Sequence, residues 1–92
     1  MSDPAVRRRV VARGHVQGVF FRDTVRRRAL ELGVAGWVHN RPDGAVEAVF
    51  EGEPAAVEEM VSLCRTGPRQ ATVSDLECIE EQVQGLSGFE VR

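Results

Sequence analysis

The sequence contains no lysine, few cysteines and no paired metal ligands, and each scarcity excludes a class of site. All 12 basic residues are arginine, so the chain lacks the lysine of a nucleotide-triphosphate P-loop. Two cysteines, Cys64 and Cys78, are too few for a disulfide scaffold, and we expect both to be buried, reduced thiols. Together with His15 and His39 they show none of the paired spacings of a zinc site. We therefore expect no metal.

Long apolar runs and an excess of positive charge are also absent. No apolar run approaches the roughly 20 residues of a membrane span, and Met1–Pro4 leads into a strand-like segment without the apolar stretch of a signal peptide. A net charge of -2 argues against a nucleic-acid partner. The 92 residues allow one hydrophobic core. We expect a single domain over residues 1–92 that is cytoplasmic, monomeric and independent of membranes and nucleic acids.

Arginine is concentrated in two runs, Arg7–Arg9 and Arg26–Arg28, which acidic stretches balance elsewhere in the chain. Such runs can dock an anionic partner, because the guanidinium group offers a planar fork of donors. A solvated face is the commoner reason for a charge run. We interpret both runs as solvated faces.

The first half of the chain alternates between strand and helix periodicity. In Val6–Arg13 apolar residues and arginines alternate, which predicts a half-buried strand. A loop follows at Gly14–Phe20. Phe21, Val25, Ala29 and Leu32 then recur at helical spacing until Gly33, so a helix is predicted.

The remaining elements complete a familiar order. They are expected as strands at 35–40 and 45–51 joined by a turn, a helix from Pro54 to Gly67, and strands at 71–81 and 89–91. The order β-α-β-β-α-β with a short last strand predicts an α+β fold, a ferredoxin-like α/β sandwich whose antiparallel sheet carries two helices on one face. Right-handed crossovers then bring the loop at 14–21 beside Asn40.

The loop at 14–21 leads directly into a helix and has the features of an anion site. Free backbone N–H groups and the positive end of the helix dipole both favour an anion there. Arg22 stands in the first helical turn, where a basic side chain is unfavourable unless an anion offsets it. A plain strand-to-helix connection is the alternative.

Two segments resemble the signatures of the acylphosphatase family. Residues 14–22, Gly-His-Val-Gln-Gly-Val-Phe-Phe-Arg, resemble GxVQGVxFR at every fixed position. Residues 36–46 resemble the second signature, with an aromatic after glycine, then asparagine, glycine and valine. The resemblance runs along nearly the whole chain and implies the same ferredoxin-like topology. It also implies an enzyme that hydrolyses the carboxyl–phosphate bond of acyl phosphates.

The resemblance assigns roles to particular residues. By it, the Asn40 amide positions the attacking water and the Arg22 guanidinium holds the phosphoryl group. The backbone amides expected to share that task are those of His15, Val16, Gln17, Gly18, Val19, Phe20 and Phe21. No cofactor is implied, and the expected partners are a small-molecule acyl phosphate and inorganic phosphate.

Two other functions compete with the interpretation of the chain as an enzyme. One is a non-catalytic phosphate- or acyl-phosphate-binding domain, of the kind built into carbamoyl-transfer proteins. Arg22 and Asn40 together favour turnover, and the lack of a fused domain favours a free-standing enzyme. An RNA-binding module is disfavoured because the first strand carries no aromatics on its arginine face. We expect His39 to be a structural or rim residue rather than a catalytic base, and Trp37 and the phenylalanines to be core residues.

Overall fold

Every element expected from the sequence is present in the computed structural model, which describes residues 4–92. The elements in chain order are β1 (Val6–His15), α1 (Phe21–Leu32), β2 (Ala35–Asn40), β3 (Val46–Gly52), α2 (Pro54–Thr66), β4 (Thr72–Glu81) and β5 (Phe89–Val91). The α+β ferredoxin-like fold is confirmed. No helix within residues 4–92 is long and apolar enough to cross a bilayer.

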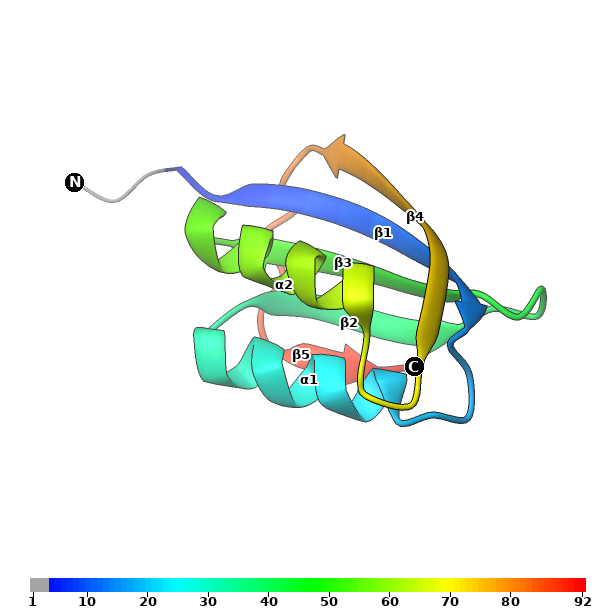
Figure 1. The fold of residues 1–92 in the computed structure, drawn as a ribbon. Helices are drawn as coiled ribbons and strands as arrows, with labels where there is room; N and C mark the ends of the chain where they lie inside the picture. The colour runs from blue at the N-terminus through cyan, green and yellow to red at the C-terminus, as the bar shows by residue number, and fades with distance from the viewer. Residues whose placement is uncertain (1–3) are drawn as a thin grey trace.

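The five strands form one sheet in the order β4-β1-β3-β2-β5. The pairs β1–β4, β1–β3 and β3–β2 are antiparallel, whereas β5 runs parallel to β2. The sheet is therefore mixed, which corrects the expectation of an antiparallel sheet. The chain crosses from β4 at one edge to β5 at the other along one end of the sheet (Figure 1). β5 therefore starts at the end of the sheet at which β4 stops, but at the opposite edge, and runs in the opposite direction.

The core lies between the sheet and the two helices, which cover the same face (Figure 1). The apolar residues that recur at helical spacing in α1 and α2 are its helical half, since Val25, Met60 and Cys64 are almost fully buried. Alternation along β1 supplies Val10 and Ala12 from the sheet. Burial of these side chains stabilises each element against the others by roughly 25 cal/mol per Å² of apolar area.

On the face of the sheet away from the helices, Arg7 contradicts the interpretation of the first arginine run as a solvated face. Arg7 is only 3% exposed. Its Nη1 lies 2.7 Å from Glu51 Oε2, and its Nε lies 2.8 Å from Glu81 Oε1. Local periodicity gives no sign of such partners, because they come from strands 44 and 74 residues further along the chain. The solvated-face reading is therefore wrong for Arg7.

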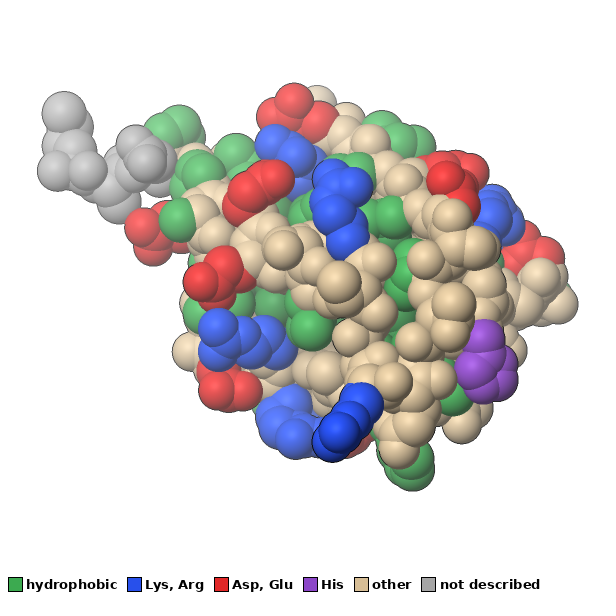
Figure 2. Space-filling view, viewed as in Figure 1, with side chains coloured by type: hydrophobic (Ala, Val, Ile, Leu, Met, Phe, Trp, Pro, Cys, Tyr) green, Lys and Arg blue, Asp and Glu red, His purple; other side chains and the backbone are tan. Residues whose placement is uncertain are grey.

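The second run, Arg26–Arg28, is exposed as expected. Arg27 pairs with Asp23 one turn earlier, and Arg28 pairs with Glu59 of α2. Figure 2 shows basic and acidic side chains next to one another over the helical layer. The positive charge of this run is thus largely offset by neighbouring carboxylates.

Three further expectations about burial need correction. Cys64 is buried, and burial raises the pKa of its thiol to about 12, but Cys78 is exposed because edge strand β4 has only one neighbour.

Trp37 is half-buried on the open face of the sheet rather than in the core. There the guanidinium carbons of Arg9 and Arg92 lie 5.5 and 5.0 Å from its ring centroid. Phe20 is 69% exposed, unlike the other phenylalanines.

Candidate active site

A cavity of about 360 Å³ lies at the end of the sheet where β1 and β2 both finish. The chain leaves β1 through residues 16–20 and enters α1, while β2 ends at Asn40. The two strands run in the same direction on either side of β3, so their carboxyl ends meet. The residues that line the cavity are Val16, Gly18, Phe20, Phe21, Arg22, Asp23, Asn40 and Val91.

The loop that borders this cavity presents unused backbone donors. The N–H groups of residues 16–20 donate to no other group among residues 4–92. Thr24 N–H is the first to bond back, to the carbonyl oxygen of Phe20 at 3.0 Å. The first N–H groups of α1 therefore also lack intrahelical partners. These donors, with the positive end of the helix dipole, form a cradle suited to an anion.

Two glycines allow the backbone of the cradle to take this shape. At Gly14 the β1–β4 register shifts, and an added Cβ would lie 2.3 Å from the carbonyl oxygen of Thr72. Gly18 has φ +74°, in the region that favours glycine. The irregularity at the end of β1 turns the chain toward the start of α1.

Arg22 differs from the other half-buried arginines because no acidic side chain pairs with it. It is the second residue of α1, and its guanidinium forms no ion pair within 4 Å among the described residues. By contrast, Arg9 pairs with Glu47 and Glu81, and Arg41 pairs with Asp43. An unpaired cation at a helix N-terminus is unfavourable by itself. The group therefore suits an anionic ligand in the cavity.

Asn40 contributes an amide that the surrounding structure does not use. Its Oδ1 is buried and accepts no hydrogen bond from any residue in the described range 4–92. The turn that follows is held by Asp43, whose Oδ1 accepts from the backbone N–H of Ala45 at 3.1 Å. Asn40 is thus available to a group in the cavity instead of capping that turn.

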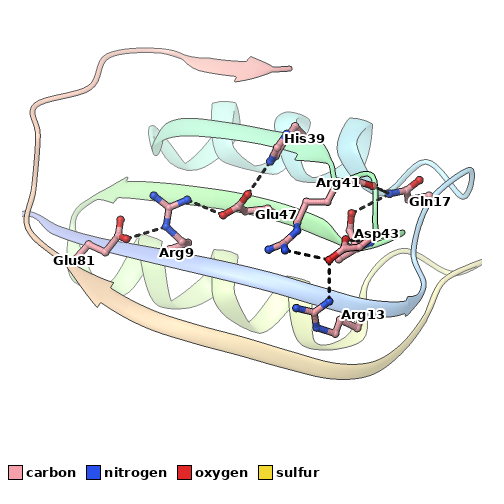
Figure 3. Close-up of polar contacts among 9 residues, drawn as sticks. Arg9, Arg13, Gln17, His39, Arg41, Asp43, Glu47 and Glu81 are labelled. Atoms are coloured by element: carbon pink, nitrogen blue, oxygen red, sulfur yellow. Dashed lines mark hydrogen bonds and ion pairs between the residues drawn. The ribbon is translucent and has the colours of Figure 1, made fainter.

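Gln17 has a part in the site that the sequence did not reveal. Only its backbone was expected to contribute, but its Nε2 donates to the carbonyl oxygens of Arg41 at 2.8 Å and Ala45 at 3.0 Å (Figure 3). This side chain ties the cradle loop to the turn after Asn40. It therefore fixes the two halves of the site relative to each other.

Three other residues of interest lie beside the cavity lining rather than in it. The His15 side chain is exposed at the end of β1, and Val19 is buried in the core, where it anchors the loop. His39 lies on the opposite face of β2 from the helices, where its Nε2 is 2.8 Å from Glu47 Oε1 (Figure 3). This position agrees with the structural reading of His39.

The arrangement of cradle, arginine and amide occurs in a chain with many close relatives. A sequence model of the acylphosphatase family matches residues 8–91. The acylphosphatase of Rubrobacter xylanophilus is 59% identical over 85 residues, which cover 91% of this chain and 77% of that protein. The acylphosphatase of Gloeobacter violaceus is 54% identical over 87 residues, or 95% and 94% of the two chains.

Solved structures agree with the sequence relatives. The structure of an acylphosphatase from Coxiella burnetii matches with a TM-score of 0.90 at 41% identity, over 96% of this chain and 93% of that one. The acylphosphatase from Bacillus subtilis matches with the same TM-score at 34% identity. The family match, the identities and the shared fold together show that this chain belongs to the acylphosphatase family of enzymes.

Proposed function

We propose that this acylphosphatase hydrolyses acyl phosphates in the cavity at the ends of β1 and β2, giving a carboxylate and inorganic phosphate. In this mechanism Arg22 and the backbone amides of the cradle hold the phosphoryl group, and the Asn40 amide positions the attacking water. The observation that carries the proposal is that Arg22 and Asn40 line one cavity, while the Arg22 guanidinium forms no ion pair and Asn40 Oδ1 accepts no hydrogen bond within residues 4–92.

The cradle supplies what phosphoryl transfer requires. Charge in the transition state is spread over the three equatorial oxygens of the phosphoryl group. The amides of residues 16–20 and the planar fork of Arg22 would donate to those oxygens. Because the fold fixes these donors before the substrate binds, little reorganisation is needed during the reaction.

Asn40 contributes orientation rather than proton transfer. An asparagine amide does not take up a proton at neutral pH, but its carbonyl oxygen can accept a hydrogen bond from a water molecule. Held in this way, the water attacks phosphorus in line with the bond to the leaving oxygen. The water's proton passes to a phosphoryl oxygen of the substrate, and the bond to the carboxylate oxygen breaks.

The leaving group explains why so few side chains suffice. The departing oxygen becomes part of a carboxylate, which is a weak base and does not need protonation as it leaves. The mechanism therefore uses no general acid, and because water attacks phosphorus directly it forms no covalent phosphoenzyme.

A non-catalytic acyl-phosphate-binding domain is the alternative, because Arg22 and the cradle alone would bind the phosphoryl group. Asn40 distinguishes the two functions. Binding alone leaves its buried, unpaired Oδ1 unexplained, whereas hydrolysis gives that oxygen a task. We therefore favour hydrolysis.

Phosphate release from acetyl phosphate and benzoyl phosphate in the presence of EDTA tests the proposal directly. We expect both substrates to be hydrolysed at the same rate with and without the chelator, since Arg22 and the cradle supply all of the donors. Within residues 4–92, no three metal-ligating side chains come together. Loss of activity in EDTA, restored by added magnesium or zinc, would contradict the mechanism. Stable binding of substrate without phosphate release would favour the alternative.

A further inference from the structure

Phe20 combines two unfavourable features at the edge of the cavity. Its side chain is 69% exposed, the largest exposed fraction among the exposed large hydrophobic residues. Its backbone has φ 64° and ψ 22°, and within residues 4–92 it is the one residue other than glycine with a positive φ. A bulky residue in this left-handed region is uncommon and strained. Folding alone would favour glycine or asparagine at this position.

The position of the Phe20 ring suggests what it does. Phe20 ends the cradle loop, and Phe21, the next residue, is 2% exposed in the core. Phe20 lines the same cavity as Arg22 and Asn40. A ring that lines a cavity and is still largely exposed lies at its mouth rather than at its floor.

A second exposed apolar side chain lines this cavity from another element. Val91 of β5 is 43% exposed. The pairing of Val38 with Val91 places it beside β2, two residues before Asn40 on that strand. The side chains of Phe20 and Val91 form what we call the apolar rim.

The polar part of the cavity lining suits the phosphoryl group of the substrate, so the apolar rim is available to the acyl part. The polar groups suited to a phosphoryl group are Arg22, Asn40 and the cradle amides. The cavity volume of about 360 Å³ falls in the range of small-molecule sites, about 300–1,000 Å³, and exceeds what a phosphoryl group alone fills. The acyl group is joined to phosphorus through one oxygen, so it must leave the cradle along neighbouring walls.

We propose that the apolar rim, and the Phe20 ring above all, contacts the acyl group and selects acyl phosphates whose acyl part is aromatic or otherwise apolar. This inference rests on the proposed hydrolysis. An aromatic acyl group packs against the Phe20 ring in an offset or edge-to-face arrangement and removes apolar surface from water. An acetyl group is too small to cover the ring.

The test compares kcat/KM for benzoyl phosphate and acetyl phosphate in Phe20→Asn and Phe20→Gly. Both replacements accept the left-handed backbone, so the cradle keeps its shape while the ring is removed. The measured quantity is the ratio of the two kcat/KM values relative to the same ratio for the parent. This comparison cancels the different intrinsic reactivity of the two leaving groups. Leu30→Ala is the matched control, since Leu30 is 52% exposed on α1 and does not line the cavity.

We expect the benzoyl-to-acetyl ratio to fall about tenfold in both Phe20 variants, in keeping with the loss of one aromatic contact, and to stay unchanged in Leu30→Ala. Inhibition by inorganic phosphate should stay close to that of the parent, because phosphate has no acyl group. An equal loss on both substrates, with weaker phosphate inhibition, would make Phe20 part of the cradle only and overturn the inference. An unchanged ratio would also overturn it. If the parent releases phosphate from neither substrate, the proposed hydrolysis fails first, and the inference with it.

Discussion

A single arginine carries much of the proposed anion binding, and its neighbour one turn later provides a matched comparison. Arg22 lines the cavity, whereas Arg26 is exposed on the same helix. Neither guanidinium has an acidic partner within 4 Å among residues 4–92. Replacing each by alanine therefore removes the same charge from the same helix and differs chiefly in access to the cavity.

Inorganic phosphate should raise the melting temperature of the parent and of Arg26→Ala but not of Arg22→Ala. A ligand that binds only the folded state stabilises it by about 2.7 kcal/mol at 100 times its Kd. Thermal unfolding with and without phosphate measures this effect. If phosphate stabilises Arg22→Ala as strongly as the parent, the anion binds elsewhere, for example at Arg26–Arg28.

At the scale of elements, one carboxylate joins β1, β3 and the connection to β5. Glu51 of β3 accepts hydrogen bonds at 3.0–3.1 Å from the backbone N–H groups of Gln84, Gly85 and Leu86, and its Oε2 is 2.7 Å from Arg7 Nη1. Those three amides belong to the connection that leads into β5. Since Val91 of β5 lines the cavity, Glu51 helps to set one wall of the active site.

The titration of Glu51 makes stability depend on pH. Burial raises the pKa of this carboxyl group, but the amide hydrogen bonds and Arg7 lower it more, so the pKa lies below its ordinary value of 4.5. A carboxylate with a lowered pKa in the folded state contributes stability that is present above its unfolded pKa. That contribution is lost as the pH falls through the folded pKa. The pKa values of Glu47 and Glu81 are lowered as well.

We predict that Glu51→Gln lowers the free energy of unfolding by about 3 kcal/mol at pH 7, because it removes the more deeply buried of the two carboxylates that pair with buried Arg7 and leaves only Glu81. The difference from the parent should shrink as the pH falls below 4.5 and through the lowered pKa of Glu51 in the folded parent, because the parent then loses the contribution of the ionised carboxylate. Urea unfolding at a series of pH values measures both effects. Glu58→Gln is the control, since Glu58 is exposed and 3.7 Å from Arg8, and its effect should be under about 1 kcal/mol. A difference that grows in acid would contradict this account.

The sequence predicted those elements whose signals are local. The helical spacing of Phe21, Val25 and Ala29 matches the buried face of α1, and Gly33 ends that helix as expected. β2 has the predicted bounds of Ala35 and Asn40. In each case the period of the apolar residues and the stop signal lie within one short segment.

Features that depend on distant partners could not be predicted in this way. The burial of Arg7 requires Glu51 and Glu81 from two other strands. The parallel direction of β5 follows from the path of the chain between the two edges of the sheet. The backbone strain at Phe20 leaves no periodic signal in the sequence. Gln17 could be recognised as a motif residue, but the motif did not reveal that its side chain binds the turn after Asn40.

For the whole molecule, the fold's main consequence is that two segments far apart in sequence meet at one end of the sheet. The cradle follows β1, and Asn40 ends β2, with β3 between the two strands. Our central claim is that the residues at this place have separate roles: the cradle and Arg22 bind the phosphoryl group, and Asn40 positions the attacking water. An interaction made mainly in the transition state affects kcat and leaves ground-state affinity nearly unchanged.

The most direct test of this claim is to measure kcat, phosphate affinity and melting temperature on the single variant Asn40→Ala. We predict a fall in kcat of roughly 100- to 1,000-fold, the loss typical of one well-placed amide in other active sites, with phosphate affinity and melting temperature close to those of the parent. His39→Ala, on the other face of the same strand, should keep kcat near the parent value. A near-normal kcat in Asn40→Ala with a lowered melting temperature would make Asn40 a structural residue and contradict the mechanism.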